Sequence, residues 1–229
     1  MKEQFTRTIG LVGEEGFAKL QSSHVLVCGL GGVGGTALEA LARSGIGNFT
    51  LIDFDVIDPS NLNRQILYKQ EDIGLPKVEI AKKYILYINK SLKVGIINSK
   101  VDESLVKTLD KNYTYIVDAI DDIKGKIALA KFAQENNIPL ISSLGMANRL
   151  DPTKVIVTTL DKTTVDPLAR KLRYEYKKAG LDTKKITVTF SKENPIKDGT
   201  SLHSMMMVPS ASGLAIASHI INQIINKEQ

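Results

Sequence analysis

The sequence has almost no cysteine and no long apolar run. Its 229 residues include one cysteine, Cys28, and no tryptophan. A single cysteine cannot form an internal disulfide, and it excludes the paired Cys-x-x-Cys motifs of many zinc sites. No stretch reaches the roughly 18 uninterrupted apolar residues of a membrane-spanning helix, and residues 1–4 show no apolar signal core. We therefore expect a protein of the reduced cytoplasm with no membrane segment.

The surplus of positive charge is also small, and it is unevenly placed. The 30 Lys and Arg residues exceed the 25 Asp and Glu residues by a net charge of +5. Residues 162–197 hold ten basic and four acidic residues, so the rest of the chain is close to neutral. This segment suits a polyanionic partner such as RNA, because cations suit phosphates and tyrosines can stack on unpaired bases; a solvated helix face would have the same composition. The cations of the predicted contact are Arg170, Lys171, Arg173, Lys177 and Lys178, interleaved with Tyr174 and Tyr176.

Apolar runs alternate with helical spacing through the first 143 residues. Short runs predict strands, and segments with apolar residues three and four apart predict helices. Strand and helix in this rhythm indicate βαβ units on a parallel sheet, whose strands are covered on both faces. The predicted strands are 25–28, 49–52, 94–97, 115–117 and 139–142, and the predicted helices are 36–43, 78–88 and 123–134.

The pattern changes after residue 151. Residues 155–157 and 186–190 predict strands without helical crossovers, and the tail from Ser212 predicts an amphipathic closing helix. We expect one α/β domain over residues 1–229, with a nucleotide-binding half (1–150) and a substrate half (151–229). Its fold class is a Rossmann-like, mostly parallel sheet extended by antiparallel strands in the C-terminal half, with helices on both faces.

A glycine-rich loop follows the first predicted strand. Residues 29–34 read Gly-Leu-Gly-Gly-Val-Gly, which fits G-x-G-x-x-G between a strand and a helix. Glycines allow a tight turn and a close approach of the backbone to phosphate, and the helix N-terminus attracts anions. Asp53 ends the next strand, where a carboxylate would meet a ribose hydroxyl. The predicted nucleotide contacts of the loop are Gly29, Gly31, Gly32 and Gly34.

The polar residues after Asp53 argue against a nicotinamide oxidoreductase. A triphosphate site needs cations for positioning and charge neutralisation, whereas a dehydrogenase does not. The run contains Asp55, Asn61, Arg64, Gln65 and Lys77. A second acidic cluster follows a later strand, where a carboxylate could hold Mg²⁺. It consists of Asp118, Asp121 and Asp122, and Asp122 could instead cap the next helix.

In this order the motifs resemble the ubiquitin-activating-enzyme-like superfamily of ThiF type, whose members adenylate carboxylates with ATP. The resemblance covers nearly the whole chain. Two narrower blocks, residues 166–169 (Asp-Pro-Leu-Ala) and 190–193 (Phe-Ser-Lys-Glu), are most similar to the members that modify tRNA. The shared motifs are Arg7-Thr8, Leu11-x-Gly13, the glycine loop, Asp53-x-Asp55, Asn61-x-x-Arg64-Gln65, Lys77 and Asp118-x-x-Asp121.

The resemblance implies a role for each motif, with ATP and Mg²⁺ bound. It implies that Asp53 and Asp55 lie at the nucleotide, with Asp53 on the ribose. Asn61, Arg64 and Lys77 would handle the phosphates and Asp121 the Mg²⁺. Arg7 would reach the ATP of the partner subunit in a homodimer. The implied catalytic residues are Arg7, Arg64, Lys77 and Asp121, and the further nucleotide contacts are Gln65 and Asp118.

The implied activity is ATP-dependent dehydration, by cyclisation, of N6-threonylcarbamoyladenosine at position 37 of tRNA. The same resemblance points to sulfur-transfer proteins as partners. One alternative is an adenylyltransferase that activates the C-terminus of a ubiquitin-like sulfur-carrier protein. The missing zinc cysteines favour tRNA over that carrier. The basic segment favours tRNA as well, and we expect its cations to contact the tRNA. A nicotinamide oxidoreductase and a non-enzymatic nucleotide-sensing module stay open as further alternatives.

Overall fold

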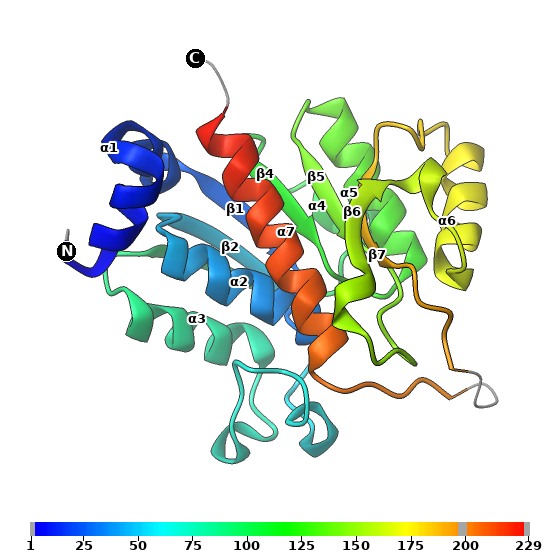
Figure 1. Ribbon diagram of the computed structural model, residues 1–229, viewed down its shortest axis with the longest axis horizontal. Helices are drawn as coiled ribbons and strands as arrows, with labels where there is room; N and C mark the ends of the chain where they lie inside the picture. Colours follow the sequence, from blue (N-terminus) through cyan, green and yellow to red (C-terminus); the bar gives the residue numbers. More distant parts are fainter. Residues whose placement is uncertain (1–2, 197–200, 227–229) are drawn as a thin grey trace.

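The computed structural model describes residues 3–196 and 201–226. One seven-stranded sheet crosses it in the order β3-β2-β1-β4-β5-β7-β6 (Figure 1). All neighbouring strands are parallel except β6, which is antiparallel to β7. The strands are β1 (His24–Cys28), β2 (Asn48–Asp53), β3 (Lys93–Asn98), β4 (Tyr115–Asp118), β5 (Leu140–Ser143), β6 (Val155–Thr159) and β7 (Thr187–Ser191). The expected fold class is confirmed, with the refinement that β7 is parallel to β5.

Helices cover both faces of this sheet (Figure 1). The largest apolar cluster joins one face to α1, α2, α3 and α7. A second cluster joins the other face to α4 and α5, and a third joins α5, α6 and β7. The helices are α1 (Thr6–Ser22), α2 (Gly32–Ser44), α3 (Lys77–Ile88), α4 (Glu103–Val106), α5 (Ile123–Glu135), α6 (Pro167–Lys178) and α7 (Met207–Ile225).

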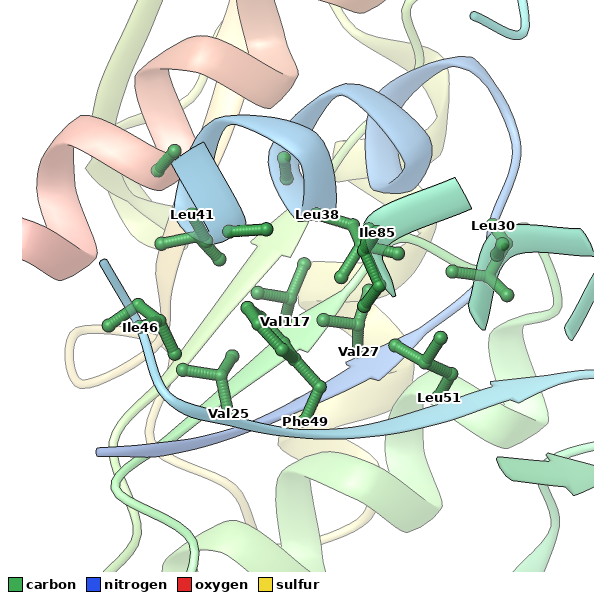
Figure 2. Packing of buried hydrophobic residues seen from close by; sticks show 14 of the residues in the cluster. Val25, Val27, Leu30, Leu38, Leu41, Ile46, Phe49, Leu51, Ile85 and Val117 are labelled. Atoms are coloured by element: carbon green, nitrogen blue, oxygen red, sulfur yellow. The ribbon is translucent and has the colours of Figure 1, made fainter. Parts of the chain in front are cut away.

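The central strands are apolar on both faces because both faces are packed. In β1, Val25 and Val27 lie under α2, where Figure 2 shows them beside Phe49 and Leu38. The alternate β1 residues, among them Cys28, belong to the cluster on the opposite face. Alternation of side chains along a strand therefore places every apolar residue of β1 in a core. Burial raises the pKa of the Cys28 thiol well above its usual value, and the nearby carboxylates of Asp118 and Asp53 raise it further.

Several helices differ from the sequence prediction. The sequence pattern did not predict α1 or α6, and α1 has three glycines, of which Gly13 breaks the helical geometry at φ 76°. Helix α2 begins at Gly32, inside the glycine loop, and α7 begins five residues before Ser212. Helix α7 lies close against α2, since a Cβ at Gly213 would be 2.5 Å from the Val33 carbonyl oxygen.

The described helices include none that is both long and apolar enough to cross a membrane.

Candidate active site

A cavity of about 300 Å³ opens at the carboxyl ends of β1, β2 and β4. Ligands bind at this edge in open α/β sheets, where loops from neighbouring strands converge. All the residues predicted for the nucleotide and its metal line it, except Gly34, Asp118 and Arg7. The lining includes Gly29, Gly31, Gly32, Asp53, Asp55, Asn61, Arg64, Gln65, Lys77 and Asp121.

The glycines of the loop have two different tasks. Gly29 has φ 87°, and a Cβ there would be 2.6 Å from the Ala119 carbonyl oxygen. A Cβ at Gly34 would be 1.8 Å from the Gly29 carbonyl oxygen, so Gly34 closes the turn without facing the cavity. A Cβ at Gly31 would be in ordinary contact with Gln65 Nε2, at 3.8 Å, and Gly31 has no side chain to cap α2. The floor of the cavity is thus bare backbone at a helix N-terminus, a cradle that fits phosphate.

Asp53 is held rigidly at the end of β2. Its Oδ2 accepts a hydrogen bond from the Leu30 backbone N–H at 2.7 Å, and its Oδ1 accepts one from the Asp55 N–H at 2.9 Å. Burial raises the pKa of this carboxyl, while the two hydrogen bonds and the charge of Lys77 oppose the rise. The geometry fixes a carboxylate on the cavity wall, where it can accept hydrogen bonds from ribose hydroxyls.

Lys77 and Arg64 bring two cations to the cavity. Lys77 is the first residue of α3 and is 5% exposed, and its Nζ lies 2.8 Å from Asp55 Oδ2. Arg64 is half-buried, and its Nη1 donates to the Ser60 carbonyl oxygen at 2.8 Å and to Asn63 Oδ1 at 2.9 Å. Two cations beside bare backbone N–H groups suit a polyphosphate, which a nicotinamide site does not require.

Gln65 carries a buried polar atom that has no partner. Its side chain is 6% exposed, and its Oε1 makes no hydrogen bond within the described part of the chain. The amide lies near Gly31 on the cavity lining. Because an unmade hydrogen bond of a buried group is costly, this acceptor fits a donor supplied by a bound ligand.

Asn61 is fixed by a short 3-10 helix (Pro59–Asn61). Its Oδ1 accepts from the Asp58 backbone N–H at 3.3 Å, while Asp58 Oδ1 accepts from the Ser60 N–H at 2.8 Å. The capping box uses only the side-chain oxygen of Asn61, so the side-chain amide nitrogen takes no part in it.

The three aspartates of the second acidic cluster have three different roles. Asp122 accepts from the Gly125 N–H at 2.8 Å and caps α5, which confirms the capping prediction. Asp121 is exposed and lines the cavity. Asp118 is fully buried and pairs with Lys126, so the structure does not bring its side chain to the cavity. Among the described residues, no three His, Cys, Asp or Glu side chains gather into a metal cage.

Arg7 lies away from the cavity of its own chain. It is exposed on α1, next to the segment where Gln4 Nε2 donates to the Ile88 carbonyl oxygen at 2.7 Å. Ile88 ends α3, whereas Lys77 begins it. At 1.5 Å per residue the two ends of α3 are about 16 Å apart, so Arg7 and Lys77 do not meet within one chain.

The predicted tRNA contact forms one face of α6. Successive helical residues turn by about 100°, which places Arg170, Lys171, Tyr174, Lys177 and Lys178 together, and all five are exposed. The other two residues of the prediction do not share this face. Arg173 donates to the carbonyl oxygen and the hydroxyl of Thr163, and Tyr176 is 1% exposed in the core. Lys197 at the end of the basic segment lies outside the described residues.

Two lysines near the cavity were missed by the sequence analysis. Lys100 lines the cavity, and its Nζ lies 3.6 Å from Asp122 Oδ1. It follows β3, so the rule that ligands bind at the carboxyl ends of parallel strands could have identified it. Lys126 is fully buried on α5. The sequence feature that could have identified it is a lysine among the apolar residues of a predicted helix.

The fold and the cavity define a nucleotide-binding α/β protein with a phosphate-directed site. The chain belongs to the ThiF family, which it matches over residues 5–229. It is 36% identical to the tRNA threonylcarbamoyladenosine dehydratase of Bacillus subtilis, over 98% of this chain and 96% of that protein. The crystal structure of the Escherichia coli tRNA N6-threonylcarbamoyladenosine dehydratase in complex with ATP matches with a TM-score of 0.92 and 35% identity, over 97% of this chain and 94% of that one. The molybdopterin-synthase adenylyltransferase of Haemophilus influenzae is 36% identical over 66% of this chain and 60% of its own length.

Proposed function

We propose that this protein is an ATP-dependent dehydratase that cyclises N6-threonylcarbamoyladenosine at position 37 of tRNA. The observation that carries the proposal is the cavity with Asp53, Arg64 and Lys77 around a bare glycine loop. It occurs in a chain that is similar over nearly its whole length to a dehydratase crystallised with ATP. The residues fit ATP, because the glycine loop presents backbone without side chains to the phosphates and because Gln65 Oε1, among the described residues, has no hydrogen-bond donor of its own.

The cavity residues would hold ATP by charge and by hydrogen bonds. Asp53 would accept hydrogen bonds from the ribose hydroxyls, as its fixed carboxylate at the end of β2 allows. Asn61, Arg64 and Lys77 would bind the phosphates, together with the N–H groups at the start of α2. Lys100, which also lines the cavity, adds a third positive charge.

Asp121 is the residue that we propose for Mg²⁺. Mg²⁺ usually keeps several waters and binds through one or two carboxylates plus substrate phosphates. The exposed carboxylate of Asp121 on the lining, with no three-residue metal cage among the described side chains, fits that arrangement. When bound, the ion would neutralise charge on the phosphates.

The proposed reaction depends on orientation. ATP would activate the threonyl carboxylate, either by adenylation or by phosphorylation. An atom of the neighbouring carbamoyl group would then attack the activated carbonyl carbon and close the ring. The attacking carbamoyl atom gives up its proton, and one carboxylate oxygen leaves as part of AMP or phosphate. Relative to the free carboxylic acid, the product has therefore lost one water. Because both reacting groups belong to one side chain, the protein has to hold them close more than to supply a strong nucleophile.

We propose a homodimer in which Arg7 of each subunit reaches the ATP of the other. The position of Arg7 on α1, away from its own cavity, supports this arrangement. Residues 1–150 would bind ATP and residues 151–229 the tRNA, within one domain. A tRNA substrate agrees with a cytoplasmic location, and sulfur-transfer proteins are partners that the family resemblance suggests.

The exposed face of α6 is the surface that we propose for tRNA. In the described part of the chain, none of its four cations forms an ion pair with a carboxylate, so they are available to phosphates. Tyr174 is 66% exposed between them and could stack on a base. These cations are Arg170, Lys171, Lys177 and Lys178.

The main alternative is activation of a sulfur-carrier protein, as the name of the molybdopterin-synthase relative suggests. The similarity to that relative covers a smaller part of both chains than the similarity to the dehydratases. An assay of ATP consumption, which detects both AMP and ADP as products, separates the two activities. Consumption stimulated by tRNA carrying threonylcarbamoyladenosine supports the dehydratase, whereas consumption that requires a carrier protein supports the alternative.

A further inference from the structure

A buried polar network lies directly behind the cavity. Lys126 and Asp118 are both fully buried, and Lys126 Nζ lies 3.0 Å from Asp118 Oδ1. The same ammonium donates to Ser142 Oγ at 3.0 Å and to the Ser143 carbonyl oxygen at 2.9 Å. Ser142 Oγ in turn donates to Asp118 Oδ2 at 2.6 Å. The network therefore joins the ends of β4 and β5 to the first turns of α5.

The three protons of the ammonium have three acceptors. A buried charge is tolerated only when it is paired and its hydrogen bonds are made. Lys126 satisfies both conditions, and neither it nor Asp118 lines the cavity. The pair does not reach a nucleotide in the cavity, so any effect on nucleotide binding has to pass through other residues.

The network anchors the loop that carries Asp121. This loop, residues 119–122, starts directly after Asp118, whose Oδ1 accepts a long hydrogen bond from the Ile120 N–H at 3.4 Å. It ends at Asp122, whose carbonyl oxygen accepts from the Lys126 N–H at 3.0 Å. Asp118 thus directly precedes the loop, and Lys126 is hydrogen-bonded through its backbone to the last residue of the loop.

The glycine loop supports the same segment from the other side. The Ala119 N–H donates to the Cys28 carbonyl oxygen at 2.8 Å. A Cβ at Gly29 would be 2.6 Å from the Ala119 carbonyl oxygen, so the two loops are in close contact. A shift of residues 119–122 would therefore move the Asp121 carboxylate relative to the phosphate cradle.

We propose that Asp118 and Lys126 are positioning residues that hold Asp121 in place for Mg²⁺–ATP. This inference rests on the proposed ATP-dependent function. Partners behind a metal ligand orient it, and their loss typically lowers metal affinity about 10- to 100-fold. The ion pair performs this task through the backbone of the loop.

The test is a double variant that removes both charges, Asp118→Asn with Lys126→Met. It leaves neither charge buried alone, and such replacements are often tolerated. Titration calorimetry measures the affinity for ATP with and without Mg²⁺. We expect the gain in affinity on adding Mg²⁺ to fall about tenfold, and we expect faster hydrogen exchange at the Ala119 and Ile120 amides of the ligand-free protein.

A double-mutant cycle with Asp121→Ala shows whether the effect passes through Asp121. If it does, adding Asp121→Ala to the double variant causes little further loss of Mg²⁺-dependent affinity. Full additivity would overturn the proposal, as would unchanged affinity with unchanged exchange. Ser142→Ala, which keeps the ion pair, should show a smaller change in the same direction and serves if the double variant does not fold.

Tyr115→Phe is the matched control. Tyr115 begins β4, the strand that Asp118 ends, and its hydroxyl lies 3.0 Å from His219 Nε2. This variant should lose stability without any change in the binding of Mg²⁺–ATP. If the unmodified protein binds no ATP, the proposed function fails, while the exchange measurement still tests the anchoring of the loop.

Discussion

Lys77 Nζ lies 2.8 Å from Asp55 Oδ2, so an ion pair holds the most buried cation of the cavity. The pair is asymmetric, because the Lys77 side chain is 6% exposed and that of Asp55 is 47% exposed. Asp55 offsets the unfavourable position of a cation at the start of a helix. The contact also restrains the rotamers of Lys77, which lowers the entropy lost when it binds a phosphate.

Lys77→Ala should weaken ATP binding about tenfold or more, since a hydrogen bond to a charged group contributes roughly 1.5–3 kcal/mol. Titration calorimetry measures this affinity. Lys83→Ala is the control, because Lys83 is exposed on the same helix and does not line the cavity. An ATP affinity that is equal in the two variants would remove Lys77 from the site.

Alanine at two different glycines of the loop should affect the fold differently. Gly34→Ala places a Cβ 1.8 Å from the Gly29 carbonyl oxygen, so we expect a clear drop in thermal stability together with loss of ATP binding. Gly31→Ala meets only Gln65 Nε2, at 3.8 Å, so the fold should persist while phosphate binding weakens. Thermal unfolding with and without ATP distinguishes the two. A stable Gly34→Ala protein would contradict the packing described above.

Charge reversal on α6 should weaken tRNA binding and its dependence on salt. The variant Lys171→Glu with Lys178→Glu changes two exposed cations and avoids Arg173, which is bound to Thr163. Each lost phosphate contact lowers the slope of log affinity against log salt by about 0.7–0.9. Lys83→Glu, on α3, with Lys90→Glu, just after it, is the control with the same change in charge. Equal tRNA affinities and salt slopes in both variants would exclude α6 as the contact.

Asp166→Ala should be among the more destabilising single substitutions outside the cavity. Asp166 caps α6 by accepting from the Ala169 N–H at 3.0 Å, and its Oδ2 lies 3.8 Å from Nη2 of the buried Arg149. Removing one partner of a buried pair costs about 3 kcal/mol or more. Asp102→Ala removes an exposed cap of α4 and should cost about 1 kcal/mol. Denaturant unfolding compares the two, and equal losses would show that Arg149 does not depend on Asp166.

Arg149 also brings the two narrow sequence blocks, residues 166–169 and 190–193, together in space. Its Nε donates to the Glu193 carbonyl oxygen at 3.0 Å, while the Glu193 carboxylate accepts from the Leu150 and Asp151 N–H groups. Burial lowers the pKa of Arg149, and the charges of Asp166 and Glu193 oppose this. Residues 166–169 and 190–193 therefore meet at one buried guanidinium.

The central strands and the cavity could be predicted from sequence because their signals are local. Parallel strands buried on both faces form continuous apolar runs, and the ends of β1 and β2 carry the glycine loop and Asp53 within a short stretch. Helix α6 was missed because few of its residues are apolar, and its core contacts are made by Ala169, Leu172 and Tyr176. Helix α1 was missed because its glycines weaken the helical signal.

Asp118 shows where sequence reasoning reaches its limit. Both Asp118 and Asp121 follow an apolar run, and the sequence does not show at which residue the strand stops. The structure ends β4 at Asp118, whose side chain is buried against Lys126, and the cavity begins further along the loop. The identity of the buried partner depends on the packing of α5 against β4, which no local pattern contains.

The account is tested most directly by incubating the protein with ATP, Mg²⁺ and tRNA from cells that lack the dehydratase. The nucleosides are then analysed by mass spectrometry. We predict that threonylcarbamoyladenosine loses the mass of one water molecule, that the change requires ATP, and that Lys77→Ala slows it strongly while Lys83→Ala does not. A protein that binds ATP but leaves the nucleoside unchanged in mass would contradict the central claim.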